Sequence, residues 1–175
     1  MARRGGFAHN YDAAAMYRLT SDETAMAALR QRVSAEILDA VEQTIDQIAA
    51  ELTDAHGVPE DAVRLFVAQR AAEATDFLRW VKAGEARGAG VPVRGLMDAM
   101  GYSSPTSISR MVPTLDHVAA VRARVDATGT RQLVHDDRGY SMALLPRENA
   151  EETVTQARKR GWLPDDVAEP DDQDA

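Results

Sequence analysis

The feature that most constrains this fold is a run of eight aliphatic side chains spaced three or four residues apart. They are Met26, Leu29, Val33, Ile37, Val41, Ile45, Ile48 and Leu52. This spacing predicts one amphipathic helix of roughly 35 residues, near 50 Å long at the standard rise. Ser21 suits its N-cap and Gly57 its C-terminal stop, so we expect the helix to occupy residues 21–57.

A helix of that length exceeds the diameter of a small domain, so part of its apolar stripe needs a partner. Burying eight aliphatic side chains, at roughly 1.5–3 kcal/mol each, is a large driving force. A symmetric homodimer is the most economical partner, and we predict that these eight side chains form a dimerisation surface. The alternative is an intramolecular hairpin with the next helix, over residues 63–81, and the two arrangements are compatible.

Glycine and proline signals divide the middle of the chain into further helices. A second helix begins at Pro59, and the run AGEARGAG at residues 83–90 is expected to end it in a glycine-rich loop. Pro92 opens a short helix, and a corner at Gly101 leads to another. Pro113 removes a helical hydrogen bond, so we expect a kink or a new helix start there.

Beyond Gly129 the apolar period changes from the helical value to two. The segment RQLVHDDRGYSMALL, residues 131–145, therefore predicts two strands around the turn sequence DDRG, where Gly139 can adopt a positive φ. A short helix capped by Asn149 follows. The last twelve residues are acidic and poor in apolar side chains, which predicts a disordered tail.

The composition excludes several chemistries. The chain has no cysteine, which rules out disulfides, thiol nucleophiles and thiolate-bound zinc. Its four histidines are scattered, with no partner at i+3 or i+4, so no metal site is expected. Without a phosphate-binding glycine loop, an HExxH sequence or a serine elbow, we predict neither an enzyme nor a cofactor. No apolar run approaches 18 residues, so we expect a cytoplasmic protein without a membrane partner.

The formal charge of −8 is distributed unevenly. Residues 76–147 hold ten basic and seven acidic residues, a sum of +3, whereas residues 21–75 hold four and eleven, a sum of −7. Residues 148–175 hold three and nine, a sum of −6. The net negative charge opposes non-specific binding of nucleic acid by the whole surface. The basic block permits DNA binding without demanding it.

The segment VRGLMDAMGYSSPTSISRMVP, residues 93–113, lies in the basic block and has the form of two helices joined at a sharp corner. Gly101 supplies the left-handed residue at which the first helix can stop. Ser104 is a good N-cap and Pro105 fits the first helical position. With Ile108 facing inward, short hydroxyl side chains and one arginine remain exposed near the N-terminus of the second helix, where phosphates and base edges are met.

The sequence MGYSSPTSISRMV resembles the helix-turn-helix of bacterial and phage transcription regulators, especially the winged type with Ser-Pro opening the recognition helix. The resemblance covers about twenty residues, or residues 75–145 if the hairpin is the wing, and Met97 stands where alanine is usual. It implies a dimeric, sequence-specific regulator that reads the major groove of double-stranded DNA with the helix starting at Pro105. The candidate DNA contacts are Ser103, Ser104, Thr106, Ser107, Ser109, Arg110, Arg122, Arg124, Arg131 and Arg138.

The expected fold is mainly α, with a long N-terminal helix and a winged helix-turn-helix-like module that includes one β-hairpin. The expected organisation is a flexible basic arm (1–20), a dimerisation helix (21–57), a DNA-binding module (58–147), a C-terminal helix (148–163) and a disordered acidic tail (164–175).

Two other functions remain open. The protein could serve as a phage DNA-packaging or plasmid-partition adaptor, in which the helix-turn-helix works beside oligomerising helices and the acidic tail binds a protein partner. Alternatively, the corner is structural and the chain is a protein-binding helical module without DNA binding.

Overall fold

The computed structural model describes residues 12–148 and 150–163. It is 75 % helical with one small antiparallel hairpin, which confirms a mainly α fold with a β-hairpin. Most of the expected basic arm and the whole acidic tail lie outside the described residues. The part of the arm that is described is helical rather than extended, because α1 spans Ala13–Ser21. No helix in the described ranges is long and apolar enough to cross a membrane.

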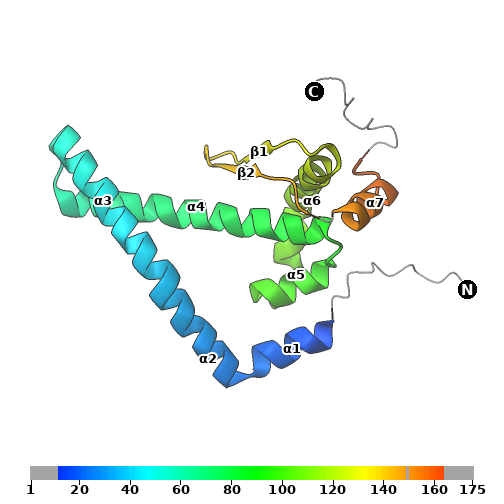
Figure 1. Ribbon diagram of the computed structural model, residues 1–175. Coiled ribbons are helices and arrows are strands. Elements are labelled where there is room, and N and C mark those ends of the chain that lie inside the picture. Colours follow the sequence, from blue (N-terminus) through cyan, green and yellow to red (C-terminus); the bar gives the residue numbers. More distant parts are fainter. Residues whose placement is uncertain (1–11, 149, 164–175) are drawn as a thin grey trace, which may run out of the picture. The chain divides into compact units, whose positions relative to one another are not determined.

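The chain forms two compact units (Figure 1). One, the helical unit, spans Ala14–Phe77; the other, the corner unit, contains the described residues from Leu78 onward, together with Asp12 and Ala13. We expected a boundary between residues 57 and 58, at the end of the long helix. The division lies instead inside the next helix, α4 (Glu60–Gly88), whose two halves belong to different units.

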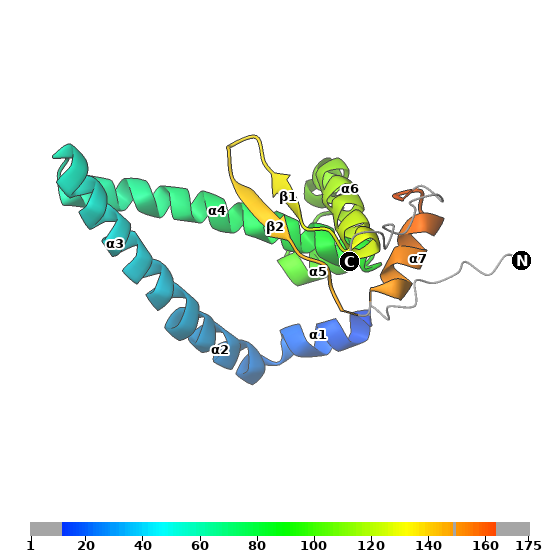
Figure 2. The same ribbon diagram turned by 45° about the horizontal axis from the view of Figure 1, so that its top comes forward.

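The long helix of the helical unit begins two residues later than expected. α2 (Glu23–Arg32), the π-helical segment η1 (Val33–Leu38) and α3 (Asp39–His56) follow one another as an unbroken rod (Figures 1 and 2). Its N-cap is Asp22, whose side chain accepts a hydrogen bond from the backbone N–H of Ala25 at 2.9 Å. The expected cap, Ser21, is the last residue of α1 and its hydroxyl donates to the carbonyl of Tyr17 instead. Gly57 ends α3 at φ 67°, as predicted.

Only the C-terminal half of the long helix finds a partner within the helical unit. Ile45 and Leu52 of α3 pack with the buried Ala49 against Val63 and Val67 of α4. The expected stripe placed Ile48 on this face, but Ala49 is fully buried and Ile48 is exposed. The smaller side chain lies at the contact because it lets the two helix backbones approach each other. The intramolecular hairpin is therefore present for this half of the helix.

The core of the corner unit lies among α4, α5 (Val93–Met100) and α6 (Pro105–Thr128). Its fully packed members are Ala83, Leu96, Ile108 and Leu115, with Trp80, Met97, Met100 and Tyr102 packed around them. The run AGEARGAG does not form the expected loop, because α4 continues to Gly88. Gly84 lies against Val118 and Gly88 against Ala119, so these glycines allow α4 to cross α6 at close range.

α6 runs without interruption from Pro105 to Thr128, with Pro113 inside it. Of the two outcomes expected at Pro113, a kink or a new helix start, the new start does not occur. The proline lacks an N–H to bond the carbonyl four residues earlier, which weakens a helix locally. Leu115, Val118, Ala119 and Val125 are buried on the C-terminal side, and their burial holds the helix together beyond the proline.

The chain then forms the predicted hairpin and a last helix. β1 (Gln132–His135) pairs antiparallel with β2 (Ser141–Leu144), in a register that places Val134 opposite Met142. Val134 and Leu144 are buried and fix the inner face of the hairpin. α7 (Glu151–Lys159) packs on α6 through Ala157 and Ala123. The expected cap Asn149 lies outside the described residues.

Candidate nucleic-acid interface

The corner between α5 and α6 depends on the backbone of Gly101. This residue has φ 72° and ψ 24°, the left-handed conformation. The backbone N–H groups of Gly101 and Tyr102 both donate to the carbonyl of Met97, the second at 2.9 Å, and so close the end of α5. A Cβ at position 101 would meet nothing within 4 Å. Glycine is therefore favoured here by backbone conformation and not by lack of space.

The start of α6 carries the predicted capping pattern. Ser104 has an extended backbone, and its hydroxyl oxygen accepts a hydrogen bond from the N–H of Thr106 at 3.3 Å. Pro105 occupies the first helical position, where its missing N–H costs nothing. Ser104 therefore serves first as a helix cap, and its hydroxyl hydrogen remains able to donate to a phosphate.

The first two turns of α6 separate an inner residue from an outer face. Ile108 is 0 % exposed and sits in the core of the corner unit. Its neighbours Thr106, Ser107, Ser109 and Arg110 are all exposed. Ser103, just before the helix, is exposed as well. Three hydroxyl groups and a guanidinium thus stand on the outside of a helix that one aliphatic residue anchors.

Because α6 does not stop at Pro113, this outer face extends past it. Arg110, Pro113, Thr114 and His117 are exposed in succession at steps of one to four residues. A helix of this length provides a continuous rod of the kind that enters a major groove. Interruption at Pro113 would have limited the face to about two turns.

Arg122, predicted to contact phosphate, is unavailable for that role. It is 4 % exposed and its guanidinium bonds the carboxylates of Glu85 at 2.8 Å and Asp126 at 3.3 Å. It also donates to the backbone carbonyl of Leu145. The prediction failed because α6 is buried on almost all sides around this position, where α4, the hairpin end and α7 surround it. Arg122 joins these elements.

The carboxylates around Arg122 are each paired with more than one cation. Burial alone would raise the pKa of Glu85, but hydrogen bonds from Lys82 and Arg122 outweigh it and hold that pKa below its ordinary value. The second carboxylate, Asp126, also pairs with Arg147. Three cations, Arg122, Arg147 and Lys82, therefore contact the two carboxylates of this group, which leaves one net positive charge.

Arg138 of the hairpin already interacts with neighbouring residues of the turn. Arg138 pairs with Asp136 at 2.8 Å and lies over the ring of Tyr140, with 5.8 Å between the guanidinium carbon and the ring centroid. Asp136 also accepts hydrogen bonds from the backbone N–H groups of residues 138 and 140. Desolvation acts to raise the pKa of Asp136, but these hydrogen bonds and the ion pair with Arg138 outweigh it and lower that pKa. Arg138 is exposed, as Arg124 and Arg131 are, but its interactions make it first a turn residue.

One cationic residue beside the corner did not emerge from the sequence. Arg94 is exposed in the first turn of α5 and lines a cleft of about 530 Å³. The cleft is bounded by Val93, Arg94, Met97, Asp98, Tyr102, Ser103 and Pro105. A cation in the first turn opposes the helix macrodipole, so its position is unfavourable for α5 alone. That conflict was the available signal that Arg94 serves something other than helix stability.

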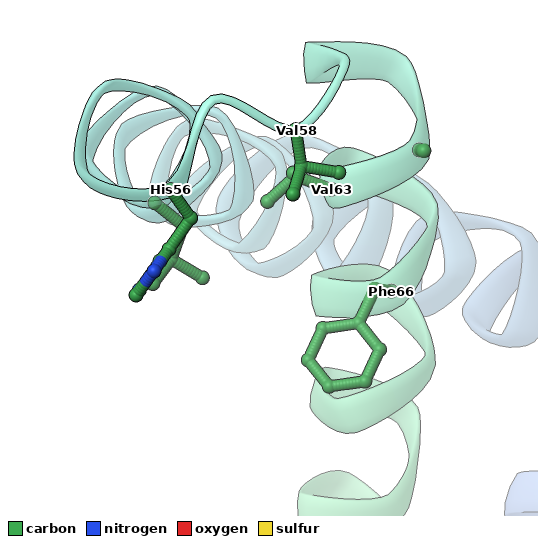
Figure 3. A pocket seen from close by; sticks show the side chains of 6 residues that line it. His56, Val58, Val63 and Phe66 are labelled. Atoms are coloured by element: carbon green, nitrogen blue, oxygen red, sulfur yellow. The ribbon is translucent and has the colours of Figure 1, made fainter.

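A second surface feature lies in the helical unit, at the turn between α3 and α4 (Figure 3). There a hollow of about 440 Å³ is lined by Leu52, His56, Val58, Ala62, Val63 and Phe66. Phe66 is 59 % exposed and the neighbouring Leu65 is 74 % exposed. The lining is apolar apart from one imidazole, so it suits apolar contact rather than acid–base chemistry.

No family model, curated protein or solved structure matches this chain.

Proposed function

We propose that the protein binds double-stranded DNA sequence-specifically and reads the major groove with the N-terminal turns of α6. The observation that carries this proposal is the outer face of Thr106, Ser107, Ser109 and Arg110 around a fully buried Ile108. Short hydroxyl groups contact phosphates and base edges, and an arginine can bond guanine with two hydrogen bonds. A regulator acts by occupying its DNA site or by recruiting another protein to it. Neither action needs a chemical step, so an exposed DNA-contacting face is sufficient.

The corner unit has further exposed cations. Arg94 lies beside the corner, Arg124 near the C-terminal end of α6 and Arg131 just before the hairpin. Arg122 is withdrawn from the proposed contacts because it is buried, and Ser104 is assigned a capping role. Two copies would present two recognition helices, and their preferred DNA would then be palindromic.

The proposal is tested by selecting bound sequences from random DNA and titrating the selected duplex by fluorescence anisotropy. Arg110→Ala is expected to weaken binding to that duplex by about 1–3 kcal/mol and to relax the preference at one base position. Arg70→Ala, which changes an exposed arginine of α4 in the helical unit, is the matched control and should leave affinity unchanged. Equal affinity of wild type and Arg110→Ala for selected and scrambled duplexes would contradict base reading by α6.

The apolar hollow at the α3–α4 turn supports a second function, that of an adaptor that binds another protein. Leu65 and Phe66 are large and exposed there, a feature typical of protein-binding surfaces. An adaptor for DNA packaging or plasmid partition would combine such a surface with the corner unit. Absence of DNA binding at both low and moderate salt would leave only the protein-binding function.

A further inference from the structure

The N-terminal half of the long helix carries an apolar stripe that stays exposed. Leu29, Val33, Ile37 and Leu38 are 39–55 % exposed, although they lie within ten residues of one another. The stripe of α3 differs, because Ile45, Ala49 and Leu52 are used against α4. Of the eight side chains first expected to form a single surface, Ile45 and Leu52 thus pack against α4, whereas Leu29, Val33 and Ile37 face outward.

The π-helical segment enlarges this outward stripe. Five residues of α-helix make about 1.4 turns, which would place Leu38 far around the axis from Val33. A π turn closes with bonds from residue i to residue i+5, and so brings residues five apart to nearly the same side. η1 begins at Val33 and ends at Leu38. It therefore adds Leu38 to the face that Leu29, Val33 and Ile37 define.

Charges flank the stripe with opposite signs at its two ends. Arg30 and Arg32 lie beside Leu29 and Val33, with Arg32 paired to Glu36 of the same helix at 3.0 Å, whereas Asp39 and Glu42 follow Leu38. A parallel pair of such helices would set arginine against arginine and carboxylate against carboxylate. An antiparallel pair sets the basic end of each helix against the acidic end of the other, with Val33 of one copy opposite Leu38 of the second.

We propose that two copies of this chain associate through Leu29, Val33, Ile37 and Leu38, with their α2–η1 segments antiparallel. The occupant is a second copy because the stripe and its flanking charges are self-complementary only in that arrangement. Complementary charges across an interface fix its register and disfavour the wrong orientation. The proposal concerns the helical unit alone and does not rest on DNA binding.

The first test measures association of the full chain by sedimentation equilibrium over a range of concentrations. Wild type is expected to be a dimer that dissociates on dilution. Leu29→Glu with Val33→Glu should weaken association by about 100-fold or more, since four carboxylates would enter the contact. Both side chains are exposed in the single chain, so its helix content should persist by circular dichroism. Leu133→Glu introduces a carboxylate at an exposed leucine of β1, outside the helical unit, and should not alter association.

The orientation is tested with spin labels, which the absence of native cysteine makes direct. Ser34→Cys and Thr24→Cys are made separately and labelled, and the distance between labels in the dimer is measured. In the antiparallel pair, moving the label one residue away from the centre of the contact lengthens the distance between the two labels by about 3 Å, because each copy contributes a rise of about 1.5 Å. The label distances in the two variants should therefore differ by about 30 Å. Equal distances would overturn the antiparallel arrangement.

Charge variants supply an independent arm. Arg30→Glu and Glu42→Arg should each weaken association alone, and an equimolar mixture should restore it as a heterodimer. A monomeric wild type at all concentrations, or dimers insensitive to Leu29→Glu with Val33→Glu, would overturn the proposal. Because no DNA enters these measurements, their failure is separate from failure of the DNA titration.

Discussion

Replacing Gly84 by alanine is expected to destabilise the contact between α4 and α6, although alanine is the better helix former. A Cβ on Gly84 would lie 2.4 Å from the Cβ of Val118 and 2.5 Å from its Cγ1. Carbon atoms in contact prefer a separation of about 3.5–4.0 Å, so the overlap exceeds 1 Å. No change of rotamer moves the Cβ of Val118, because that atom is bonded to the backbone. One helix must therefore shift.

Two opposing effects set the magnitude. Alanine gains about 1 kcal/mol over glycine inside a helix. Overpacking a buried site costs about 1–3 kcal/mol, and this site lies at the upper end or beyond because relief requires moving backbone. Val118 is buried and the Leu115 carbonyl oxygen stands 3.3 Å from the new carbon, which limits the direction of any shift. We expect a net loss of about 2 kcal/mol in the free energy of unfolding.

Urea unfolding followed by circular dichroism measures this loss. Gly88→Ala is the matched control, since its nearest neighbour would be an ordinary 3.5 Å away and it should be neutral or slightly stabilising. In the double variant Gly84→Ala with Val118→Gly, the Cβ is present on α4 and absent on α6, so the overlap is removed. Its loss of unfolding free energy should be smaller than the sum of the losses of the two single variants. Gly84→Ala as stable as wild type, or more so, would refute a close crossing of α4 and α6.

Three further outcomes follow from the corner unit. The pKa of Glu85 is lowered in the folded protein, so its ionised form contributes stability above the ordinary pKa of 4.5. This contribution is lost as the pH falls through the folded-state pKa. Unfolding measured at a series of pH values should show this loss in wild type and a smaller loss in Arg122→Met. Pro113→Ala restores a helical hydrogen bond in an exposed part of α6 and should raise the free energy of unfolding by about 1–3 kcal/mol. An unchanged free energy of unfolding would mean that the helix accommodates the proline without strain. Gly101→Ala should cost about 1 kcal/mol through backbone strain alone, and Gly101→Asn less; a larger loss would point to a contact at this position.

Local chemistry was readable from the sequence wherever a single residue decides the backbone. The left-handed stops at Gly57 and Gly101, the cap at Ser104 and the hairpin turn were predicted and are confirmed. Each depends on a few adjacent residues, so no distant contact was needed to infer it. The inward position of Ile108, and hence the exposed hydroxyl face, followed from the same local periodicity.

What failed depends on contacts between distant segments. Arg122 looked like a surface cation because nothing in its own helix shows that Glu85, 37 residues earlier, lies against it. The glycines at 84 and 88 read as a loop because their partner helix was unknown. A new helix start at Pro113 was one of the two expected outcomes, because the sequence does not show the burial that carries α6 past the proline. The π turn of η1 shifts the apolar period by one residue, which no regular spacing predicts.

The anchoring of α6 by Ile108 has a consequence for how such a protein can change. Stability at this point resides in one inward methyl-rich side chain, while the atoms available to a ligand belong to Thr106, Ser107, Ser109 and Arg110. A library randomised at those four positions, with Ile108 kept, would be expected to retain the fold in most of its members. Altered recognition could then evolve, or be engineered, without a compensating change in the interior.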